Sequence, residues 1–228
     1  MVTEGRPRRV ADGPEGRAIA IEVLRAGGVV AVPTDTVYGI AVWLEAPGGI
    51  ERLFAAKQRP PDRAIALLLG DAAQAAEIGV LNGAAEALAQ AYWPGGLTLV
   101  VPRRTDRPLP LALTGGELAP GGIPTVGLRV PDHPAPRALA AALGPLPTTS
   151  ANLSGQPEAS TADEIERQLG GAVDLILDGG RAGGGPASTV VDATSPEAAI
   201  LRVGAIPTAD VEAVLTSSSP RGGPPAAR

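Results

Sequence analysis

The stretch from Val29 to Gly39 constrains the fold more than any other part of the sequence. Two apolar runs, residues 29–32 and 37–43, flank the polar triplet Thr34-Asp35-Thr36. Pro33 ends the first run, because proline cannot donate to a strand ladder. The pattern predicts a strand, a turn and a second strand. Open α/β sheets bind ligands at the carboxyl ends of their strands, so the triplet is a candidate binding loop.

The composition argues against several classes of protein. A chain of 228 residues is long enough for one domain with a buried core. The absence of cysteine excludes disulfides, thiolate nucleophiles and cysteine-ligated zinc, and a single histidine argues against a histidine metal centre. Neither a membrane-spanning run nor the apolar core of a signal peptide is recognisable, so we expect a cytoplasmic protein. A net charge of −5 and 2% aromatic residues disfavour a general nucleic-acid binder, while a local basic pocket stays open.

Helical and strand periodicities alternate along the chain, which predicts an α/β fold. Further expected strands cover residues 65–69, 97–101, 125–131, 173–177, 187–192 and 199–204, the last two as a hairpin. Expected helices cover residues 15–26, 47–56, 72–78, 84–92, 138–143, 161–170 and 207–215. Gly27 follows the first helix as a stop, and capping boxes at Asp71/Gln74 and Thr161/Glu164 begin two others. Residues 102–124 form a long Pro/Gly-rich segment, either a lid or a flexible loop.

Lys57 is the one lysine among 19 basic residues. It stands with Arg59 and Arg63 between a predicted helix and an apolar strand. A position that keeps a compact ammonium in an arginine-rich chain indicates ligand binding. The alternatives are chance and simple compensation of the helix dipole.

Other polar side chains occur where apolar ones are expected. Residues 148–155 predict a tight turn whose hydroxyls and amide suit phosphate, or an ordinary Ser/Asn turn. Arg129 shares a strand face with Thr125 and is either an anion clamp or an edge-strand arginine in solvent. Ser188 and Arg202 interrupt apolar strands and need polar partners.

His133 is interpreted as a turn or helix-entry residue rather than a catalytic base, because no nucleophile motif accompanies it. We hypothesise that the segments around Thr36, Lys57 and Ser150 converge on one anionic ligand.

Six motifs, in their order along roughly residues 15–208, resemble the YrdC/TsaC family of threonylcarbamoyl-AMP synthases. They are Pro33-Thr34-Asp35-Thr36-Val37-Tyr38-Gly39, Lys57-x-Arg59-Pro60, Trp93-Pro94-Gly95-x-Leu97-Thr98, Thr125-Val126-Gly127-x-Arg129-x-Pro131-Asp132-His133-Pro134, Thr149-Ser150-Ala151-Asn152-x-Ser154-Gly155, and Ser188-Thr189-Val190-Val191-Asp192 with Ile200-Leu201-Arg202.

The resemblance implies a twisted, open, mixed sheet flanked by helices, with a concave, positively charged cavity. It implies that L-threonine, bicarbonate and ATP, with Mg2+, give threonylcarbamoyl-AMP and pyrophosphate for threonylcarbamoyladenosine at tRNA position 37. Separate proteins would then transfer the group to tRNA, and weak tRNA binding by this chain is also expected.

The same resemblance assigns roles to individual residues. Lys57 and Arg59 are implied to be catalytic through charge stabilisation, and no side chain is expected to bind a metal. Residues implied to bind threonine are Thr36, Arg129, Ser150 and Ser188. Residues implied to bind the nucleotide are Arg59, Arg63, Thr125, Asn152, Ser160 and Arg202.

The sequence departs from the family pattern in places. Leu68 stands where longer members can carry a histidine that touches threonine, and Ala64-Ile65 replaces a frequent Pro-Leu.

We interpret the chain as the short, single-domain form: a flexible N-terminus at 1–14, a catalytic domain at 15–208, and a helix remnant with a disordered tail at 209–228. The alternatives are a non-enzymatic RNA-binding or ribosome-associated module, an inactive paralogue or one with another acid substrate, and a carbamoyl-adenylate former of hydrogenase maturation.

Overall fold

Ten strands in the described part of the chain form one mixed sheet in the order β1-β8-β2-β3-β7-β4-β6-β5-β9-β10. The computed structural model describes residues 5–58, 65–106, 108–110, 113, 122–183 and 185–218. The strands are β1 Arg8–Ala11, β2 Val30–Val32, β3 Gly39–Ala41, β4 Ala66–Leu68, β5 Leu97–Pro102, β6 Thr125–Arg129, β7 Leu146–Ser150, β8 Leu175–Asp178, β9 Thr189–Asp192 and β10 Ala199–Arg202. The helices are α1 Pro14–Arg25, α2 Gly49–Lys57, α3 Ala73–Ile78, α4 Gly83–Tyr92, α5 Pro134–Leu143, α6 Ala162–Leu169, the 3₁₀ turn η2 Gly170–Ala172, and α7 Thr208–Ser218.

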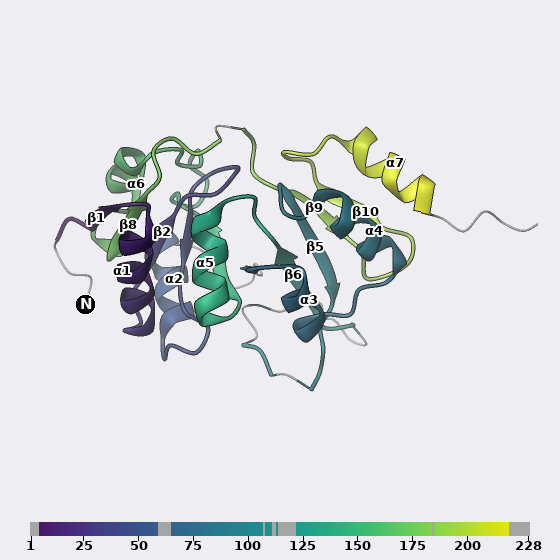
Figure 1. Ribbon diagram of the computed structural model, residues 1–228, viewed down its shortest axis with the longest axis horizontal. Coiled ribbons are helices and arrows are strands. Elements are labelled where there is room, and N and C mark those ends of the chain that lie inside the picture. Colours follow the sequence, from purple (N-terminus) through teal and green to yellow (C-terminus); the bar gives the residue numbers. More distant parts are fainter. Residues whose placement is uncertain are drawn as a thin grey trace, which may run out of the picture.

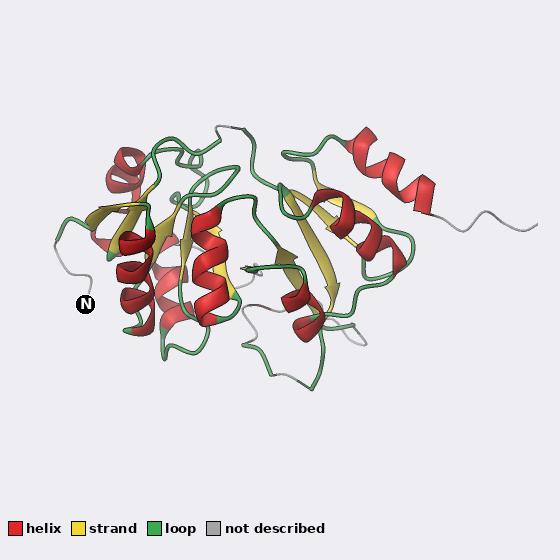
Figure 2. Ribbon diagram, in the orientation of Figure 1, coloured by secondary structure: helices red, strands yellow, loops and turns green. Residues whose placement is uncertain are grey.

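Helices cover the two ends of the sheet differently (Figure 1). At the β1 end, α1 and α5 pack on one face through Leu24 and Leu139, and α2 and α6 pack on the other through Leu53 and Ile165. At the β10 end, α3 and α4 cover one face and α7 lies along α4, as Figure 2 also shows. The predicted α/β class, with a twisted open sheet flanked by helices, is confirmed.

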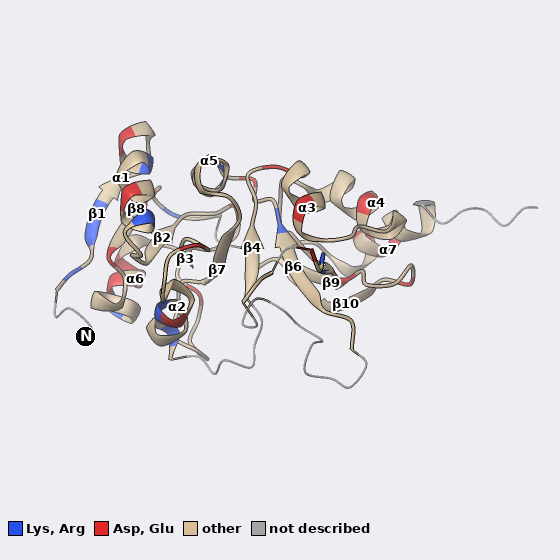
Figure 3. Cartoon of the chain, turned by 90° about the horizontal axis from the view of Figure 1, so that it is seen from below, with Lys and Arg blue, Asp and Glu red and all other residues tan. Residues whose placement is uncertain are grey.

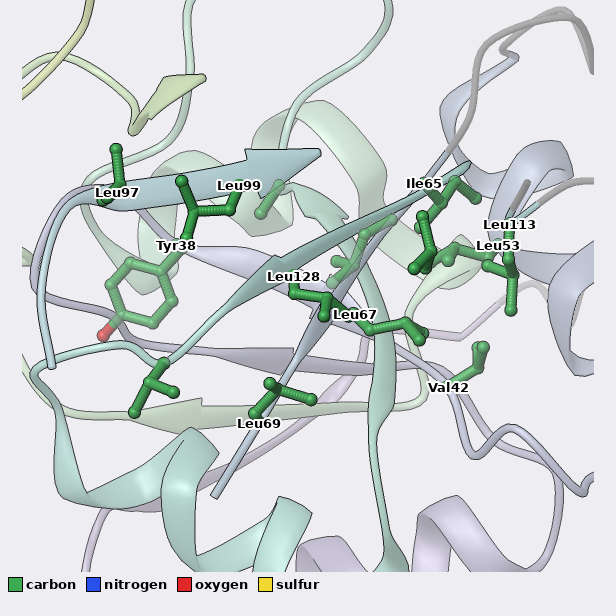
Figure 4. Close-up of a cluster of buried hydrophobic side chains, with 14 of the residues drawn as sticks. Tyr38, Val42, Leu53, Ile65, Leu67, Leu69, Leu97, Leu99, Leu113 and Leu128 are labelled. Carbon is green, nitrogen blue, oxygen red and sulfur yellow. The ribbon is translucent and has the colours of Figure 1, made fainter. Parts of the chain in front are cut away.

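The larger core lies between the sheet and the helices α2, α3, α4 and α6. Figure 4 shows Leu67, Leu99 and Leu128 together with Tyr38 in this core. The three leucines come from neighbouring strands and are fully buried. Burial of each leucine stabilises the fold by roughly 2 kcal/mol. Because side chains alternate along a strand, the leucines occupy the face that the helices cover, and the opposite face of these strands is free to carry polar groups.

Several local predictions are confirmed. β2 and β3 pair antiparallel around the Thr34–Thr36 turn, and β9 and β10 form the expected antiparallel pair. Gly27 follows α1 with φ of 83°, a conformation that favours glycine. Thr161 caps α6, and His133 begins α5 by accepting the Ala135 amide on Nδ1. The lone histidine is therefore a helix-entry residue.

The prediction of a tight turn over residues 148–155 is wrong for its first part. Thr148, Thr149 and Ser150 lie in strand β7, which pairs antiparallel with β3 on one side and β4 on the other. Helix α5 also begins at Pro134 rather than at residue 138. Strand β7 arises from long-range pairing, which local composition does not reveal. The start of α5 is set locally, by the His133 cap and by Pro134 in the first turn.

The N-terminal end of the domain differs from the prediction, whereas the expected last helix is present as α7. The supposed flexible N-terminus contains β1, which pairs parallel with β8. The C-terminal helix packs against α4, with Val211 fully buried and the Tyr92 hydroxyl donating to the Asp210 carbonyl at 2.9 Å. The tail predicted as disordered begins at residue 216, but residues 216–218 belong to α7, and 219–228 lie outside the described residues. About half of the long Pro/Gly-rich segment at 102–124 also lies outside them. No helix in the described ranges is long and apolar enough to cross a membrane.

Candidate functional site

A cavity of about 270 Å³ lies on one face of the sheet. Helices α1 and α5 cover this face at the β1 end, and the cavity occupies the part that they leave uncovered. Its wall is rich in hydroxyl groups and contains two guanidinium groups, from Arg129 and Arg202. The Ser and Thr residues that line it are Thr34, Thr36, Thr98, Thr125, Thr148, Thr149, Ser150 and Ser188.

Strand register explains why residues so far apart in sequence meet there. Paired residues on neighbouring strands point to the same face of a sheet. In the cavity wall, each pair of neighbouring strands has such paired residues. From β10 to β3 they are Arg202 with Val190, Val190 with Thr98, Val100 with Gly127, Arg129 with Leu68, Ala66 with Thr148, and Ser150 with Gly39. This row runs from the edge strand β10 to β3 near the middle of the sheet.

Arg129 is the most constrained cation of the wall, with 6% of its surface exposed. Its Nε donates to the Gly95 carbonyl at 3.0 Å, Nη1 to Thr36 Oγ1 at 3.1 Å, and Nη2 to Asp35 Oδ1 at 2.7 Å. Burial lowers the pKa of Arg129, the negative charge of Asp35 opposes that change, and the positive charge of Arg202 adds to it. The two guanidinium groups therefore act on each other across the cavity.

The Thr34–Thr36 turn is held by its own side chains and by a second loop. Thr34 Oγ1 donates to the Val37 carbonyl at 2.6 Å and accepts the Thr36 amide at 3.2 Å. The Tyr38 hydroxyl donates to the Gly180 carbonyl and accepts the Gly179 amide, and burial raises its pKa to about 12. Gly183 packs so closely on the Asp35 carbonyl that a side chain there would clash. The turn is thus fixed before any ligand binds.

Ser188 and Arg202 form the wall at the edge strand. Ser188 Oγ lies 2.8 Å from Thr98 Oγ1. Arg202 Nη2 donates to the Ser188 carbonyl at 2.8 Å and to Ser188 Oγ at 3.3 Å. Arg202 is exposed to solvent, in contrast to Arg129, because β10 is the last strand of the sheet.

Lys57 lies directly behind Ser150 and does not itself line the cavity. Its ammonium, on the last residue of α2, donates to the Ser150 carbonyl at 2.6 Å, to Ser150 Oγ at 3.1 Å and to Asn152 Oδ1 at 2.9 Å. Ser150 Oγ in turn donates to Asn152 Oδ1 at 2.6 Å. A single ammonium can satisfy three acceptors in different directions, which a planar guanidinium cannot do as readily.

The structure brings most of the predicted site residues together. Thr36, Arg129, Ser150, Ser188, Thr125 and Arg202 line the cavity, and Lys57 and Asn152 form the layer behind Ser150. Ser160 is elsewhere: it bonds to Glu164 and Arg181 and is absent from the cavity wall. Arg59 and Arg63 lie outside the described residues.

Sequence reasoning missed Thr98 as a cavity residue, and it placed Thr34 and Thr148 in candidate binding segments without giving either a role of its own. Thr98 is a buried hydroxyl residue within the apolar strand β5, the same signal that singled out Ser188. Thr148 reaches the cavity from strand β7 and not from the turn that was predicted. Leu68, the departure from the family pattern, lines the cavity with an apolar side chain.

The charges around the cavity are unevenly distributed. Among the described lining residues there is no Asp, Glu or His, and no cluster of three such residues suited to a metal ion occurs in the described ranges. The helices on the opposite face, α3, α4 and α7, carry acidic residues and no basic ones, as Figure 3 shows. The arginines of the wall therefore face the cavity, while the helices of the opposite face carry negative charge.

The chain is similar to proteins of known family. A family model described as Sua5_yciO_yrdC, Telomere recombination, matches residues 22–204. A protein of Bacillus subtilis named threonylcarbamoyl-AMP synthase is 36% identical over 200 residues, covering 87% of this chain and 56% of that protein. A Vibrio cholerae protein of the same name is 36% identical over 189 residues, covering 81% of this chain and 95% of that protein.

A solved structure is similar over almost the whole fold. The crystal structure of Pyrococcus abyssi Sua5 complexed with L-threonine superposes with a TM-score of 0.80 at 32% identity, covering 93% of this chain and 61% of that one. The chain therefore spans little more than half the length of the Bacillus subtilis relative and of the Pyrococcus abyssi protein.

Proposed function

Because the chain belongs to the Sua5/YciO/YrdC family, we propose that it is a nucleotidyltransferase that makes L-threonylcarbamoyl-AMP. The observation that carries the proposal is the convergence of Thr36, Arg129, Ser150 and Ser188, from four separate segments, on one cavity wall. Hydroxyl donors and guanidinium groups in a partly buried cavity suit a small ligand with a carboxylate and several oxygen atoms.

The wall offers different partners for the two substrates. Arg129 engages three of its five N–H groups with the described protein, which leaves two for a carboxylate such as that of threonine. Arg202, together with Thr125, is assigned to the nucleotide. Arg129 and Arg202 repel each other, so an anionic ligand between them is stabilised by both.

The reaction needs no covalent intermediate on the protein. The threonine amine attacks the carbon of CO2, supplied by dehydration of bicarbonate, and loses a proton to give a carbamate. A carbamate oxygen then attacks the α-phosphorus of ATP, and the bond to the β-phosphate oxygen breaks to release pyrophosphate. The net change is threonine, bicarbonate and ATP to threonylcarbamoyl-AMP, pyrophosphate and water. The protein contributes orientation and charge stabilisation.

Lys57 contributes by holding the wall in place. Hydrogen bonds from its ammonium fix Ser150 and Asn152, so we assign it a positioning role, while Arg59 keeps its proposed contact with the nucleotide. Because no carboxylate lines the described wall, Mg2+ would be held by the phosphates of ATP, whose charge it would neutralise.

The product places the protein before a transfer step on tRNA. A threonylcarbamoyl group on AMP is an activated mixed anhydride, which suits transfer to a nucleoside amine by separate cytoplasmic proteins. Weak tRNA binding by this chain remains part of the proposal, although the acidic helices α3, α4 and α7 restrict it to other faces.

The test is pyrophosphate release from ATP by the purified protein, with each substrate omitted in turn. We expect release to require both L-threonine and bicarbonate, and L-serine and D-threonine to support it poorly. Nucleotide binding without turnover under every condition would overturn the proposal in favour of an inactive or RNA-binding member of the family.

A pair of matched variants ties the activity to the cavity. Thr36→Val removes the hydroxyl that Arg129 contacts while keeping the side-chain volume, and should raise the KM for threonine by about tenfold. Thr216→Val, in the exposed last turn of α7, makes the same chemical change away from the cavity and should leave the KM unchanged. Equal effects of the two substitutions would contradict the assignment.

A further inference from the structure

Asp35 is a carboxylate that the proposed chemistry does not use and that does not line the cavity. It stands between the two threonines of the turn, with 17% of its side chain exposed. Its Oδ1 accepts from Arg129 Nη2 at 2.7 Å and from the Asp132 amide at 3.1 Å. One oxygen atom thus joins the turn, the cavity arginine and the segment that follows β6.

The three bonds of Arg129 determine the orientation of its guanidinium plane. Each of the three nitrogen atoms donates once, to Gly95, to Thr36 and to Asp35. A planar group held at three atoms has no freedom to rotate, and the two N–H groups left over keep constant directions. Of these three contacts, only that with Asp35 pairs the cation with a negative charge.

A carboxylate in this place has two opposite effects on an anionic ligand. It reduces the net positive charge that the ligand meets, which weakens binding. It also keeps a nearly buried guanidinium paired and oriented, which strengthens binding. The second effect dominates where the carboxylate is itself fixed, because it then cannot leave the arginine or follow the ligand. The Asp132 amide provides that fixation.

We propose that Asp35 is a positioning residue for substrate binding, acting through Arg129 without touching the substrate. The inference rests on the proposed function, since it takes the carboxylate of threonine as the partner of Arg129. Asp35 adds to threonine affinity and leaves nucleotide affinity unchanged.

The decisive variant is Asp35→Asn, which removes the charge and keeps the size. We expect the Kd for threonine, measured by calorimetry, to rise about tenfold, with the Kd for ATP unchanged. If Asp35 only competed with the ligand for Arg129, the same variant would bind threonine more tightly than the wild type, which would overturn the proposal.

Asp12→Asn is the matched control. Asp12 accepts two hydrogen bonds from Arg17, at 2.7 and 3.0 Å, in a part-buried pair away from the cavity. This variant breaks a comparable ion pair and should leave threonine affinity unchanged. A loss of threonine affinity equal to that of Asp35→Asn would mean that general destabilisation, not positioning, is responsible.

A second variant covers the case in which Asp35→Asn does not fold. Asp35→Glu keeps the charge but displaces it by one methylene, so we expect a loss of threonine affinity of about threefold. Threonine binding as tight as that of the wild type would show that charge alone matters and would overturn a positioning role.

A double-mutant cycle with Arg129→Lys identifies the route of the effect. If Asp35 acts through Arg129, Asp35→Asn should change threonine affinity much less in the Arg129→Lys background. An unchanged effect in that background overturns the proposal.

Failure of the wild-type protein to bind threonine would instead refute the proposed function, and the Asp35 proposal with it. If the wild-type protein binds threonine and the Asp35→Asn variant binds it with the same Kd, the Asp35 proposal alone is refuted.

Discussion

The two ends of the cavity are built by different means. At the inner end, defined by Thr36, Arg129 and Ser150, the cations are nearly buried: Arg129 is 6% exposed and Lys57, behind Ser150, is 3% exposed. At the edge end, defined by Ser188 and Arg202, the cation is exposed and is held by a backbone carbonyl and a hydroxyl. No carboxylate contacts Arg202 in the described residues.

This difference follows from the position of each strand in the sheet. β6 and β7 have neighbours on both sides, whereas β10 has only β9. A cation in the middle of the sheet loses its hydration and must be paired and hydrogen-bonded in advance. A cation on the edge keeps water and can adjust to its ligand. Interactions at the inner end should therefore be strong and insensitive to salt, and those at the edge end weaker and screened.

The largest effect should come from breaking the inner end with Arg129→Ala. This change leaves the Asp35 carboxylate without its cation, so the free energy of unfolding should fall by about 3 kcal/mol. Threonine affinity should fall about 100-fold, because the cation for its carboxylate is lost. Urea denaturation and calorimetry measure the two. Arg52→Ala, which breaks the more exposed pair with Asp174, is the control and should cost less than about 1 kcal/mol.

Lys57→Met tests the layer behind the inner end. Methionine fills a similar volume but donates no hydrogen bond, which removes the ammonium from Ser150 and Asn152. We expect the free energy of unfolding to fall by about 2 kcal/mol and threonine-dependent pyrophosphate release to slow about tenfold. A variant with normal stability and normal release would show that Ser150 keeps its orientation without Lys57.

Arg202→Ala tests the edge end. Because the side chain is exposed, the free energy of unfolding should change by less than about 0.5 kcal/mol. The Kd for ATP should rise about tenfold at low salt, and this difference from the wild type should shrink in 0.5 M KCl, a salt concentration chosen for strong screening. A salt-independent loss, or a loss of threonine affinity as large as that of Arg129→Ala, would remove the distinction between the two ends.

The smallest effect should be a pH dependence through His133, which caps α5 just after the segment that binds Asp35. Burial lowers the pKa of His133 and Arg17 adds to this, while Asp12, Asp35 and Asp132 oppose it. The neutral ring is the form that accepts the Ala135 amide. Stability from this group is therefore fully present above the unfolded-state pKa of about 6.5 and is lost as the pH falls below it, toward the lower pKa of the folded protein.

Urea denaturation between pH 7 and 5.5 checks this sign, since most carboxylates titrate below that window. His133→Asn keeps a side chain that can cap α5 without titrating. We expect the variant to lose the fall in stability that the wild type shows in this range. The same slope in both proteins would assign the pH dependence to another group.

Local signals carried much of the prediction of the fold. Pro33 and the polar triplet marked the β2–β3 turn, and Gly27 and Thr161 marked helix ends, because each acts through its nearest neighbours. Strand β7 was missed, since Thr148 to Ser150 resembles a turn until β3 and β4 pair with it. β1 was missed for the same reason, as its pairing partner in the described sheet, β8, is 167 residues away (Arg8 pairs with Leu175).

The candidate site divides along the same line. Sequence by itself determined which residue types gather in which segments, and hence the polar triplet, the single lysine and the polar residues in apolar strands. Only the tertiary structure decided that six of them share one wall, that Ser160 does not, and that Asp35 joins Arg129. The physical reason is strand register: a shift of one residue in any pairing would turn that strand's side chains to the opposite face, and register is set by packing of the whole sheet.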